Sequence, residues 1–265
     1  MKIHSTAIVD PTAKIRDDVA IGPYAVIGAD VVVGEKSIIE SHAVIEPNVT
    51  IGARNFIGHA AIIGTAPQDL SFSSERKTYV AIGNDNVIRE HSTIHRGSAE
   101  GSVTKIGDKN FFMAGAHVGH NCEIGNNVII ANNCLLGGHV SVDDGAFLGG
   151  GCVFHQHICV GRFAITQGGS GFSTSIPPFV IAAEVNYVFG LNVVGLRRAG
   201  FSAKDRDEIK AAFKLVYASG LNLAQAIAKA MTVKFGAPAQ EFIDFVANAR
   251  KRGICAYHHR KDHEH

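Results

Sequence analysis

Aliphatic residues recur at every sixth position along most of the chain. Stepping by six from Ile3 to Ile63 meets eleven positions, and every one of them is Ile or Val. After residues 64–81 the pattern resumes one residue out of phase at Ile82 and continues to Val160, with only position 100 skipped. A repeat of fixed period indicates a solenoid, in which each repeat buries its apolar positions against its neighbours.

A second, smaller residue occupies the fifth position of most hexads, as at Ala25, Val31 and Cys134. Glycine often follows the large aliphatic residue, where a tight corner needs a permissive backbone. Short strands joined by such corners predict a triangular coil of three hexads, so that residues one coil apart lie about 4.8 Å from each other. The predicted fold is a left-handed parallel β-helix of hexapeptide repeats. Cys134 and Cys152 stack in it and are expected to fill the core.

Two segments interrupt the hexads. They are residues 64–81 and residues 97–105, and we expect the second to replace part of a hexad. Loops in a regular solenoid tend to lie on its binding face, although a tolerated surface insertion would look the same.

The hexads stop near Thr166, and a helical period begins later, at about Ser202. We therefore divide the chain into a β-helix domain over residues 1–184 and a C-terminal α-helical domain over residues 185–265. The final ten residues are polar and are expected to be disordered. Capping signals predict three helices, from Ser202 (with Asp205 three residues on) to Gly220, from Asn222 onward, and from Pro238 to about Arg250.

Charge is unevenly distributed between these two parts. Residues 185–265 hold 13 Lys and Arg against 7 Asp and Glu, a net +6, whereas the whole chain carries +1. A basic section favours an acidic partner, such as an acidic carrier protein, nucleic acid or phosphate, but it also suits a solvated helical surface. The chain has no run of eighteen apolar residues and no signal-peptide pattern, which predicts a cytoplasmic protein without stable membrane insertion.

Six of the fourteen histidines lie between residues 95 and 157. With a coil of three hexads, His120 lies beneath Gly138, and Asn121, His139 and His157 form one stack. His120 is then a candidate general base beside a backbone N–H that can receive oxyanion charge, which is the pairing that acyl transfer needs. Three histidines on neighbouring coils could instead bind zinc, as in γ-class carbonic anhydrases, or form a purely structural stack.

Several segments of the chain resemble one family of transferases. They are TIHRG (93–97), AHVGHNCEIGN (116–126), GGHVSVDD (137–144), FHQ (154–156), PQDL (67–70) and FGLNVVGLRRAGFS (189–202). Together they are similar to the UDP-N-acetylglucosamine O-acyltransferases that begin lipid A synthesis, over almost the whole chain. The hexads mark only the superfamily, whereas GLRRAGFS is specific and argues against the N-acyltransferase of the same pathway.

This resemblance implies transfer of an (R)-3-hydroxyacyl group from acyl carrier protein to the sugar 3-hydroxyl of a UDP-sugar, UDP-N-acetylglucosamine. It implies a homotrimer with sites between subunits, and no cofactor, metal or nucleic-acid partner. His120 falls on the family's catalytic base and Gly138 on its oxyanion residue. Gly168 falls where the family measures acyl length, and its missing side chain favours a longer chain. The remaining matches are substrate-contacting positions: Gln68, Asp69, His117, His139, His155, Gln156, Asn192 and Arg198.

Four positions depart from the family pattern. Asn121, which we count with the catalytic residues, replaces the Asp expected after the catalytic histidine; an amide can orient an imidazole but stabilises imidazolium less than a carboxylate does. Ser71 replaces an expected Lys, and Val194 and Ala199 stand where the family has Glu and Arg. The sequence therefore indicates the type of reaction, acyl transfer, more firmly than it indicates which sugar accepts the acyl group. One alternative is a 3-amino UDP-sugar acylated to an amide, and another is a non-catalytic or zinc-binding β-helix.

Overall fold

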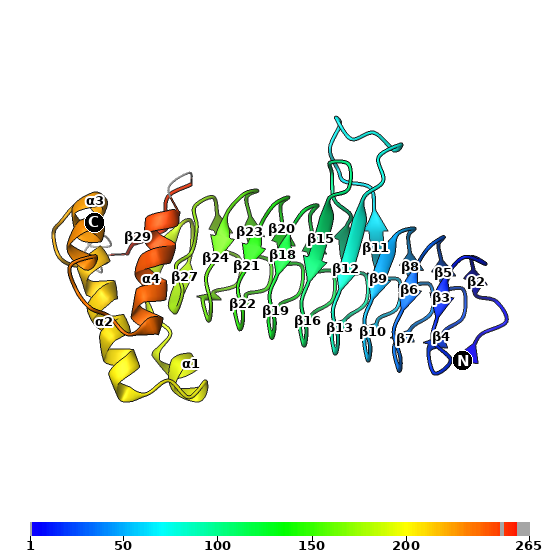
Figure 1. The fold of residues 1–265 in the computed structure, drawn as a ribbon, viewed down its shortest axis with the longest axis horizontal. Helices are drawn as coiled ribbons and strands as arrows, with labels where there is room; N and C mark the ends of the chain where they lie inside the picture. The colour runs from blue at the N-terminus through cyan, green and yellow to red at the C-terminus, as the bar shows by residue number, and fades with distance from the viewer. Residues whose placement is uncertain (1, 250–251, 259–265) are drawn as a thin grey trace.

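A three-sided coil forms most of the molecule. The computed structural model describes residues 2–249 and 252–258. In Figure 1 the coil extends as a long prism from the N-terminus to a group of helices at the opposite end. Strands of successive coils pair in parallel along each face, which confirms the predicted left-handed parallel β-helix.

Each face of the prism is one sheet. Sheet A contains β1 (Lys2–Ile3), β4 (Ala20–Ile21), β7 (Ile38–Ile39), β10 (Phe56–Ile57), β13 (Val87–Ile88), β16 (Phe111–Phe112), β19 (Ile129–Ile130), β22 (Phe147–Leu148), β25 (Ile165–Thr166), β27 (Val180–Ala183), β28 (Tyr187–Leu191) and β29 (Ala256–Tyr257). Sheet B contains β2 (Ile8–Val9), β5 (Val26–Ile27), β8 (Val44–Ile45), β11 (Ile62–Thr65), β14 (Thr93–His95), β17 (His117–Val118), β20 (Leu135–Leu136), β23 (Val153–Phe154) and β26 (Gly171–Phe172). Sheet C contains β3 (Lys14–Ile15), β6 (Val32–Val33), β9 (Val49–Ile51), β12 (Tyr79–Ile82), β15 (Val103–Ile106), β18 (Glu123–Ile124), β21 (Ser141–Val142) and β24 (Cys159–Val160). The chain visits A, B and C in turn, and we name the corners A–B, B–C and C–A after the sheets they join.

The large aliphatic position of each hexad points into the prism. Ile27, Ile45 and Ile63 pair with one another in successive coils, three hexads apart as predicted, and each is almost completely buried. Burial of such a side chain contributes about 1.5–3 kcal/mol, so the stacked rungs are the main source of stability along the prism. The thiols of Cys134 and Cys152 are fully buried in this core, as predicted, and burial raises the pKa of the Cys134 thiol.

The first interruption explains the change of phase in the hexads. Ile82 pairs with Ile51, and the interval between them exceeds the regular three hexads by two further hexads and one residue. The two hexads alone would keep the pattern in phase, whereas the extra residue moves every later rung by one position. We call residues 66–78, between β11 and β12, the first loop.

The second interruption adds residues and does not replace any. Ile106 pairs with Ile82 across four hexads instead of three, so this insertion is one whole hexad and the phase is kept. The prediction that residues 97–105 replace part of a hexad is therefore wrong. We call residues 96–102, between β14 and β15, the second loop. Both loops join sheet B to sheet C, and Figure 1 shows them rising side by side from the prism.

The β-helix continues past Thr166, where the six-residue pattern of the sequence stops. β26 stacks on β23 and β27 stacks on β25. Ile181 pairs with Ile165 across an interval two residues short of three hexads, so the last coil leaves the six-residue pattern. β28 then returns antiparallel to β27, and β29 adds to its edge. The prediction that the final ten residues are disordered is therefore wrong for β29. Residues 259–265 lie outside the described residues.

The predicted helices are present, and the first two begin with the predicted N-caps. α2 (Ala203–Tyr217) and α3 (Leu223–Ala230) each begin with a capping box, formed by Ser202 and Asn222. α2 ends three residues before Gly220, and α4 (Ala237–Asn248) begins one residue before Pro238. The expected end of α4, Arg250, lies outside the described residues. None of the described helices is long and apolar enough to cross a membrane.

One short helix, α1 (Val193–Arg198), has no counterpart in the sequence analysis. It is a single capped turn that lies between β28 and α2, and its six residues are too few to show a helical period. Leu196 is its buried residue. This helix carries one of the residues predicted to contact substrate, Arg198.

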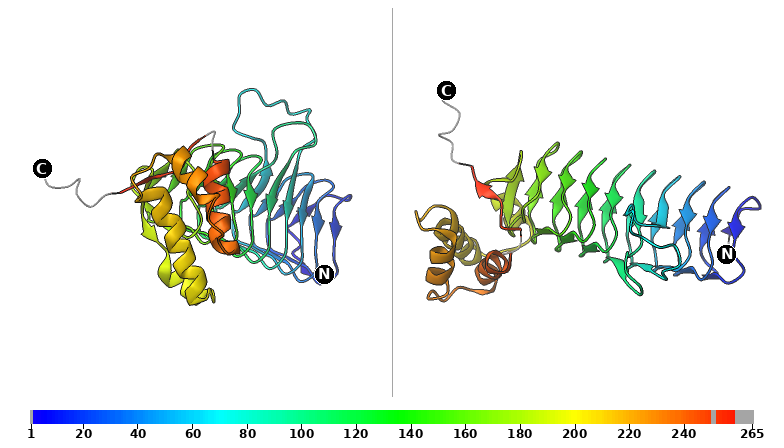
Figure 2. Two further views of the ribbon diagram at one scale, coloured as in Figure 1. Left: turned by 60° about the vertical axis from the view of Figure 1, so that its left-hand side comes forward. Right: turned by 90° about the horizontal axis from the view of Figure 1, so that it is seen from above.

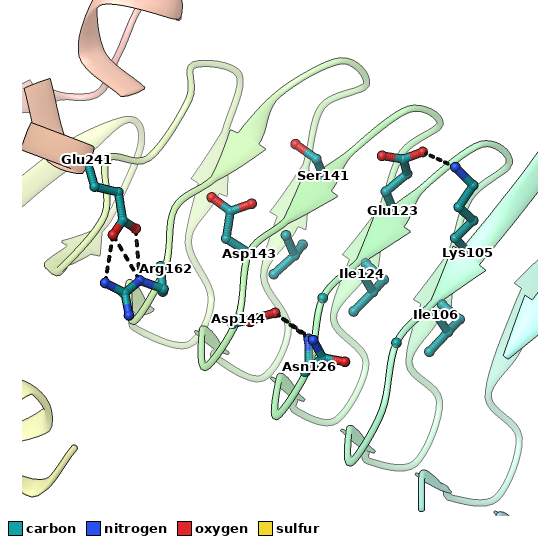
Figure 3. A pocket seen from close by; sticks show the side chains of 13 residues that line it. Lys105, Ile106, Glu123, Ile124, Asn126, Ser141, Asp143, Asp144, Arg162 and Glu241 are labelled. Carbon is teal, nitrogen blue, oxygen red and sulfur yellow. Dashed lines mark hydrogen bonds and ion pairs between the residues drawn. The ribbon is translucent and has the colours of Figure 1, made fainter. Parts of the chain in front are cut away.

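An ion pair holds the helices against the last coils. Figure 3 shows Glu241 of α4 facing Arg162 at the C–A corner, with Nη2 of Arg162 2.6 Å from Oε2 of Glu241. The guanidinium also lies 5.3–5.4 Å from the ring centroids of Phe163, Phe179 and Phe201. Because β28 and β29 extend sheet A, the two parts share a sheet as well as this contact. The division into residues 1–184 and 185–265 stays a prediction.

Candidate active site

The residues predicted to form the site lie at all three corners of the prism. Gly168 is at the A–B corner, between β25 and β26. Asn192 contacts Phe163 at the C–A corner, and Arg198 is the last residue of α1, the helix that Asn192 caps. The others gather at the B–C corner and on sheet B next to it: Gln68, Asp69, His117, His120, Asn121, Gly138, His139, His155 and Gln156. Figure 2 shows the two loops on the same edge of the prism. A single chain therefore assembles only part of the predicted site.

His120 and Gly138 are in direct contact, as the coil length predicts. A Cβ atom placed on Gly138 would overlap Nε2 and Cε1 of the His120 ring, so only glycine leaves room for the ring. The Gly138 carbonyl accepts a hydrogen bond from the N–H of His157, 3.1 Å away. Among the residues that the structure describes, none accepts a hydrogen bond from the Gly138 N–H. A ring nitrogen and an unengaged N–H thus occupy one corner.

The amide of Asn121 holds the other nitrogen of the His120 ring. Oδ1 of Asn121 lies 3.0 Å from Nδ1 of His120, and it also accepts hydrogen bonds of 2.9 Å from the N–H and the hydroxyl of Ser98. Because an amide oxygen cannot donate, Nδ1 carries the proton and Nε2 of the neutral ring keeps its lone pair. Sequence reasoning missed Ser98, since it lies in the second loop, where the insertion hides which residues stack.

The predicted stack of corner histidines is confirmed. The rings of His139 and His157 are nearly parallel with centroids 4.5 Å apart, and His120 meets His139 edge-on at 5.2 Å. Asn121, His139 and His157 all have left-handed backbones, with φ of 59°, 60° and 66°. Burial first, then His157 and His120, lowers the pKa of His139. A lowered pKa favours neutral rings in the stack, where positive charges would repel one another.

His155 and Gln156 lie one coil further along the same corner. The chain passes close here, because a Cβ on Gly137 would be 2.9 Å from the backbone nitrogen of Gln156. Nδ1 of His155 donates to the carbonyl of Gln156 at 3.1 Å, which leaves its Nε2 available as an acceptor. Both side chains are exposed, so they form a rim beside His139.

His117 lies on the outer face of sheet B beside the catalytic candidates. Its Nδ1 is 2.8 Å from Oγ1 of Thr93, and the ring of His95 meets it edge-on with a centroid separation of 4.7 Å. His95 is 5% exposed, and burial, followed by His117 and His120, lowers its pKa to about 4. Burial also lowers the pKa of His117. Both rings are therefore expected to be neutral at pH 7.

The first loop places Asp69 and Gln68 on the solvent side of the corner, and both are exposed. Oδ1 of Asp69 accepts hydrogen bonds from the N–H and the hydroxyl of Ser71, each 2.8 Å long. These bonds are the main cause that lowers the pKa of Asp69, and His120 and Arg76 add to it. Ser71 thus fixes the carboxylate within the loop.

Asn192 serves a structural purpose within the chain. Its Oδ1 caps α1 by accepting from the N–H of Gly195 at 2.9 Å, and its Nδ2 donates to the carbonyl of Phe163 at 2.9 Å. The residue is 5% exposed, so little of the side chain is free for another contact. Arg198, in contrast, is exposed at the end of α1.

Metal and thiol chemistry find no support in the described residues. No group of three or more His, Cys, Asp or Glu side chains there is arranged to hold a metal ion. The five cysteines are free thiols, and four of them are buried. The histidine corner offers a ring nitrogen that can accept a proton, an amide that holds the other ring nitrogen, and an unengaged N–H, which together suit proton transfer beside a carbonyl that gains negative charge.

Two family models match the chain. Residues 176–255 match the model described as UDP-N-acetylglucosamine O-acyltransferase, domain 2, which covers β27 to Cys255 and so includes the helices. Residues 104–138 match the bacterial transferase hexapeptide model, described as six repeats. The first match covers the part of the chain that follows the hexads.

Curated relatives match over nearly their full length. Proteins named acyl-[acyl-carrier-protein]–UDP-N-acetylglucosamine O-acyltransferase are 42% identical in Syntrophobacter fumaroxidans and 43% identical in Paraburkholderia xenovorans. Each alignment covers 96% of this chain, and it covers 99% and 98% of the two relatives, respectively.

Solved structures agree in fold. The UDP-N-acetylglucosamine acyltransferase of Francisella novicida superposes with a TM-score of 0.91 at 36% identity, covering 97% of this chain and 95% of that one. The enzyme of that name from Campylobacter jejuni gives 0.90 at 34% identity, covering 97% and 100%. With the curated relatives, these matches show that the chain belongs to the family of UDP-N-acetylglucosamine O-acyltransferases.

Proposed function

We propose that this chain transfers an (R)-3-hydroxyacyl group from acyl carrier protein to the 3-hydroxyl of UDP-N-acetylglucosamine, the first step of lipid A biosynthesis. One observation carries the proposal for the site. Nε2 of His120, the ring nitrogen that Asn121 leaves free, and the unengaged N–H of Gly138 lie together at the B–C corner. Membership of the family supports the substrates, since the relatives are named for them.

The reaction needs no covalent enzyme intermediate. Nε2 of His120 takes the proton of the sugar hydroxyl as its oxygen attacks the thioester carbonyl carbon. The carbonyl oxygen becomes an oxyanion, which the Gly138 N–H stabilises. The C–S bond then breaks, and the imidazolium returns its proton to the departing thiolate. Asn121 holds the ring through Nδ1 in both protonation states and is less stabilising toward imidazolium than a carboxylate would be.

A homotrimer would unite the parts of the site that one chain keeps apart. The outer faces of sheets A and B are mainly apolar. The half-buried Phe56, Phe111 and Ile129 lie on sheet A, and Val44, Leu135 and Val153 lie on sheet B beside the polar pair of Thr93 and His117. The outer face of sheet C is polar, as at Lys14, Lys105, Glu123 and Ser141. Exposed apolar faces of this kind are typical of protein interfaces. Sheet B of one subunit would then pack on sheet A of the next around a threefold axis.

This packing would place the three corners in a functional order. The B–C corner of one subunit would meet the C–A corner of its neighbour at the outer end of the interface, bringing Arg198 toward His120. The A–B corners would lie near the axis, so that Gly168 would stand at the inner end of the same interface. An acyl chain running inward between subunits from His120 would be measured there, and the absence of a side chain at Gly168 leaves room for a longer chain.

The carrier protein would dock on α2. Arg206, Lys210 and Lys214 line a hollow of about 450 Å³ whose floor is apolar, with Leu196 and Phe213 among its residues. Cations around an apolar floor complement an acidic protein that presents an acyl group.

All five cysteines are free, as expected of a protein in a reducing compartment, which supports the prediction of a cytoplasmic location.

The experiment is an acyl-transfer panel. Purified protein is incubated with 3-hydroxyacyl carrier proteins of several chain lengths and with UDP-N-acetylglucosamine or its 3-amino analogue, and products are identified by mass spectrometry. The proposal predicts thioester consumption and an ester product that mild base cleaves. A base-stable amide formed in preference would assign the 3-amino acceptor instead, and no thioester consumption with any pair would contradict acyl transfer.

A further inference from the structure

One oxygen atom in the corner accepts three hydrogen bonds. Oδ1 of Asn121 is 2.9 Å from the N–H of Ser98, 2.9 Å from the Ser98 hydroxyl and 3.0 Å from Nδ1 of His120. A backbone N–H can only donate, so the amide end that faces Ser98 is the oxygen and not the NH₂ group. The same oxygen then faces His120 and selects the ring form with the proton on Nδ1.

The orientation of the Asn121 amide must be fixed, because one end of the amide is an oxygen that accepts and the other is an NH₂ group that donates. Turning the amide by half a turn would point the NH₂ group at His120, and Nδ1 would then have to accept the hydrogen bond. The proton would move to Nε2, and the ring could no longer take a proton from a substrate hydroxyl. A carboxylate has no such second orientation, since both of its oxygens accept.

Ser98 is itself held by contacts between the two loops. Its carbonyl accepts a hydrogen bond of 3.0 Å from Nη1 of Arg76 in the first loop. The N–H of Lys77 donates to the Glu100 carboxylate at 3.0 Å, and the N–H of Gly101 donates to the Lys77 carbonyl at 2.9 Å. The two insertions therefore form one unit that presents Ser98 to the corner.

We propose that Ser98 is a positioning residue: it fixes the amide orientation of Asn121 and thereby keeps Nε2 of His120 free of its proton. The proposal rests on the proposed role of His120 as the base. It gives the second loop a function, and it explains how this chain works with an amide at position 121. The Ser98 N–H, which can only donate, supplies the direction that a symmetric carboxylate does not need, and the Ser98 hydroxyl adds a second hydrogen bond to the same oxygen.

A double-mutant cycle separates this role from simple support of the loop. Ser98→Ala removes the hydroxyl donor, and it should lower kcat about tenfold while changing KM for the sugar less than twofold, because the ring is misoriented and not the substrate. In the Asn121→Asp background the same change should lower kcat less than about twofold. Ser98→Thr, which keeps the hydroxyl, should restore kcat. An equal loss in both backgrounds would overturn the proposal, since a structural contact would matter equally in each.

The matched control is Ser102→Ala in the same loop. The Ser102 hydroxyl accepts from the N–H of Ala99 at 3.0 Å and makes no recorded bond to Asn121. This variant should leave kcat within about twofold of the parent if loop support alone has little effect on the base. A tenfold loss here, equal to that of Ser98→Ala, would also count against a specific role for Ser98.

Nitrogen NMR tests the proposal without any turnover. In protein labelled with ¹⁵N-histidine, the His120 signals are assigned by their loss in His120→Ala, and their shifts report which ring nitrogen carries the proton. We expect the Nδ1–H form in the parent chain and in Ser98→Thr, and a mixture of both forms in Ser98→Ala. A main Nε2–H form in the parent chain would overturn the proposal, and an unchanged Nδ1–H form in Ser98→Ala would overturn the part assigned to the hydroxyl, because the Ser98 N–H remains in that variant. Because this readout needs no substrate, it decides the role of Ser98 even if the acyl-transfer panel fails.

Discussion

The ring of His120 fills the space in which a side chain at Gly138 would begin. Glycine at this position therefore does two things: it admits the ring, and it presents an N–H that no described group engages. The backbone there does not need glycine for its conformation, since its φ is not in the left-handed region. The requirement for glycine comes from the neighbouring ring.

Gly138→Ala should therefore displace His120. Because misplacement of a catalytic group by about 1 Å can cost about 10²-fold, we expect kcat to fall by at least that factor. The core rungs on either side are unchanged, so the melting temperature and the size of the assembly should stay close to those of the parent. Steady-state kinetics and light scattering on the same sample measure both. Full activity would show that the ring does not need this position.

The buried His95 should make stability depend on pH. Its pKa is lowered to about 4 in the folded chain, mainly by burial, whereas an unfolded histidine titrates near 6.5. Between these values the unfolded state binds the extra proton, so stability is complete above pH 6.5 and falls as the pH drops toward 4, by about 3 kcal/mol at most. His117 and His139 shift in the same direction.

Thermal melting of the parent and of His95→Gln from pH 7 to pH 4 measures this effect. The variant should lose less stability across the window than the parent does, whatever its stability at pH 7. Equal slopes would mean that His95 does not titrate differently in the two states.

The assembly should be a trimer, with three times the chain mass of 28.1 kDa. Leu135, 43% exposed on the apolar outer face of sheet B, would be covered in it. Leu135→Asp should therefore dissociate the trimer, because a carboxylate buried at an interface without a partner is costly. Ser141→Asp, on the polar face of sheet C, is the control and should stay trimeric. Light scattering at micromolar concentration measures the mass of each assembly. A stable monomer of the parent chain would contradict the proposal that the sites lie between subunits.

Charge on α2 should govern the carrier-protein substrate. Lys210→Glu should raise KM for the acyl carrier protein roughly threefold to tenfold and leave KM for the UDP-sugar unchanged. Lys14→Glu makes the same charge change at the far end of the prism and should have no effect. Added salt should also raise the first KM, because the screening length shortens to about 8 Å at physiological ionic strength. If the KM for the acyl carrier protein changes neither with salt nor in Lys210→Glu, the carrier protein docks on another surface.

Much of the fold could be predicted because the rungs repeat. Spacing alone predicts the stacking of Ile27, Ile45 and Ile63 and the contact of His120 with Gly138, since each coil is three hexads long where nothing is inserted. The same argument from spacing fails where a coil is not three hexads long. It therefore does not predict the last coil, in which Ile165 pairs with Ile181.

The rest of the site depends on contacts that spacing does not encode. Ser98 reaches Asn121 only through an insertion of one hexad, whose residues have no stacking partner in the pattern. The resemblance predicts a substrate contact for Asn192, and in the structure its amide caps α1, a helix too short to leave a period in the sequence. The structure thus shows a polar side chain, expected to contact substrate, that hydrogen-bonds to the backbone of its own chain.

The central claim is that His120 is the general base, and its removal tests this claim most directly. With saturating acyl carrier substrate and UDP-N-acetylglucosamine, His120→Ala should lower kcat by about 10²–10⁴-fold, the usual contribution of a positioned base. His139→Ala, at the same corner one coil further on, should lose less if that ring only contacts substrate. Position 120 is not a core rung, so the folded assembly should persist and can be checked by light scattering. Full activity of His120→Ala across the pH range, with the parent active, would contradict the account.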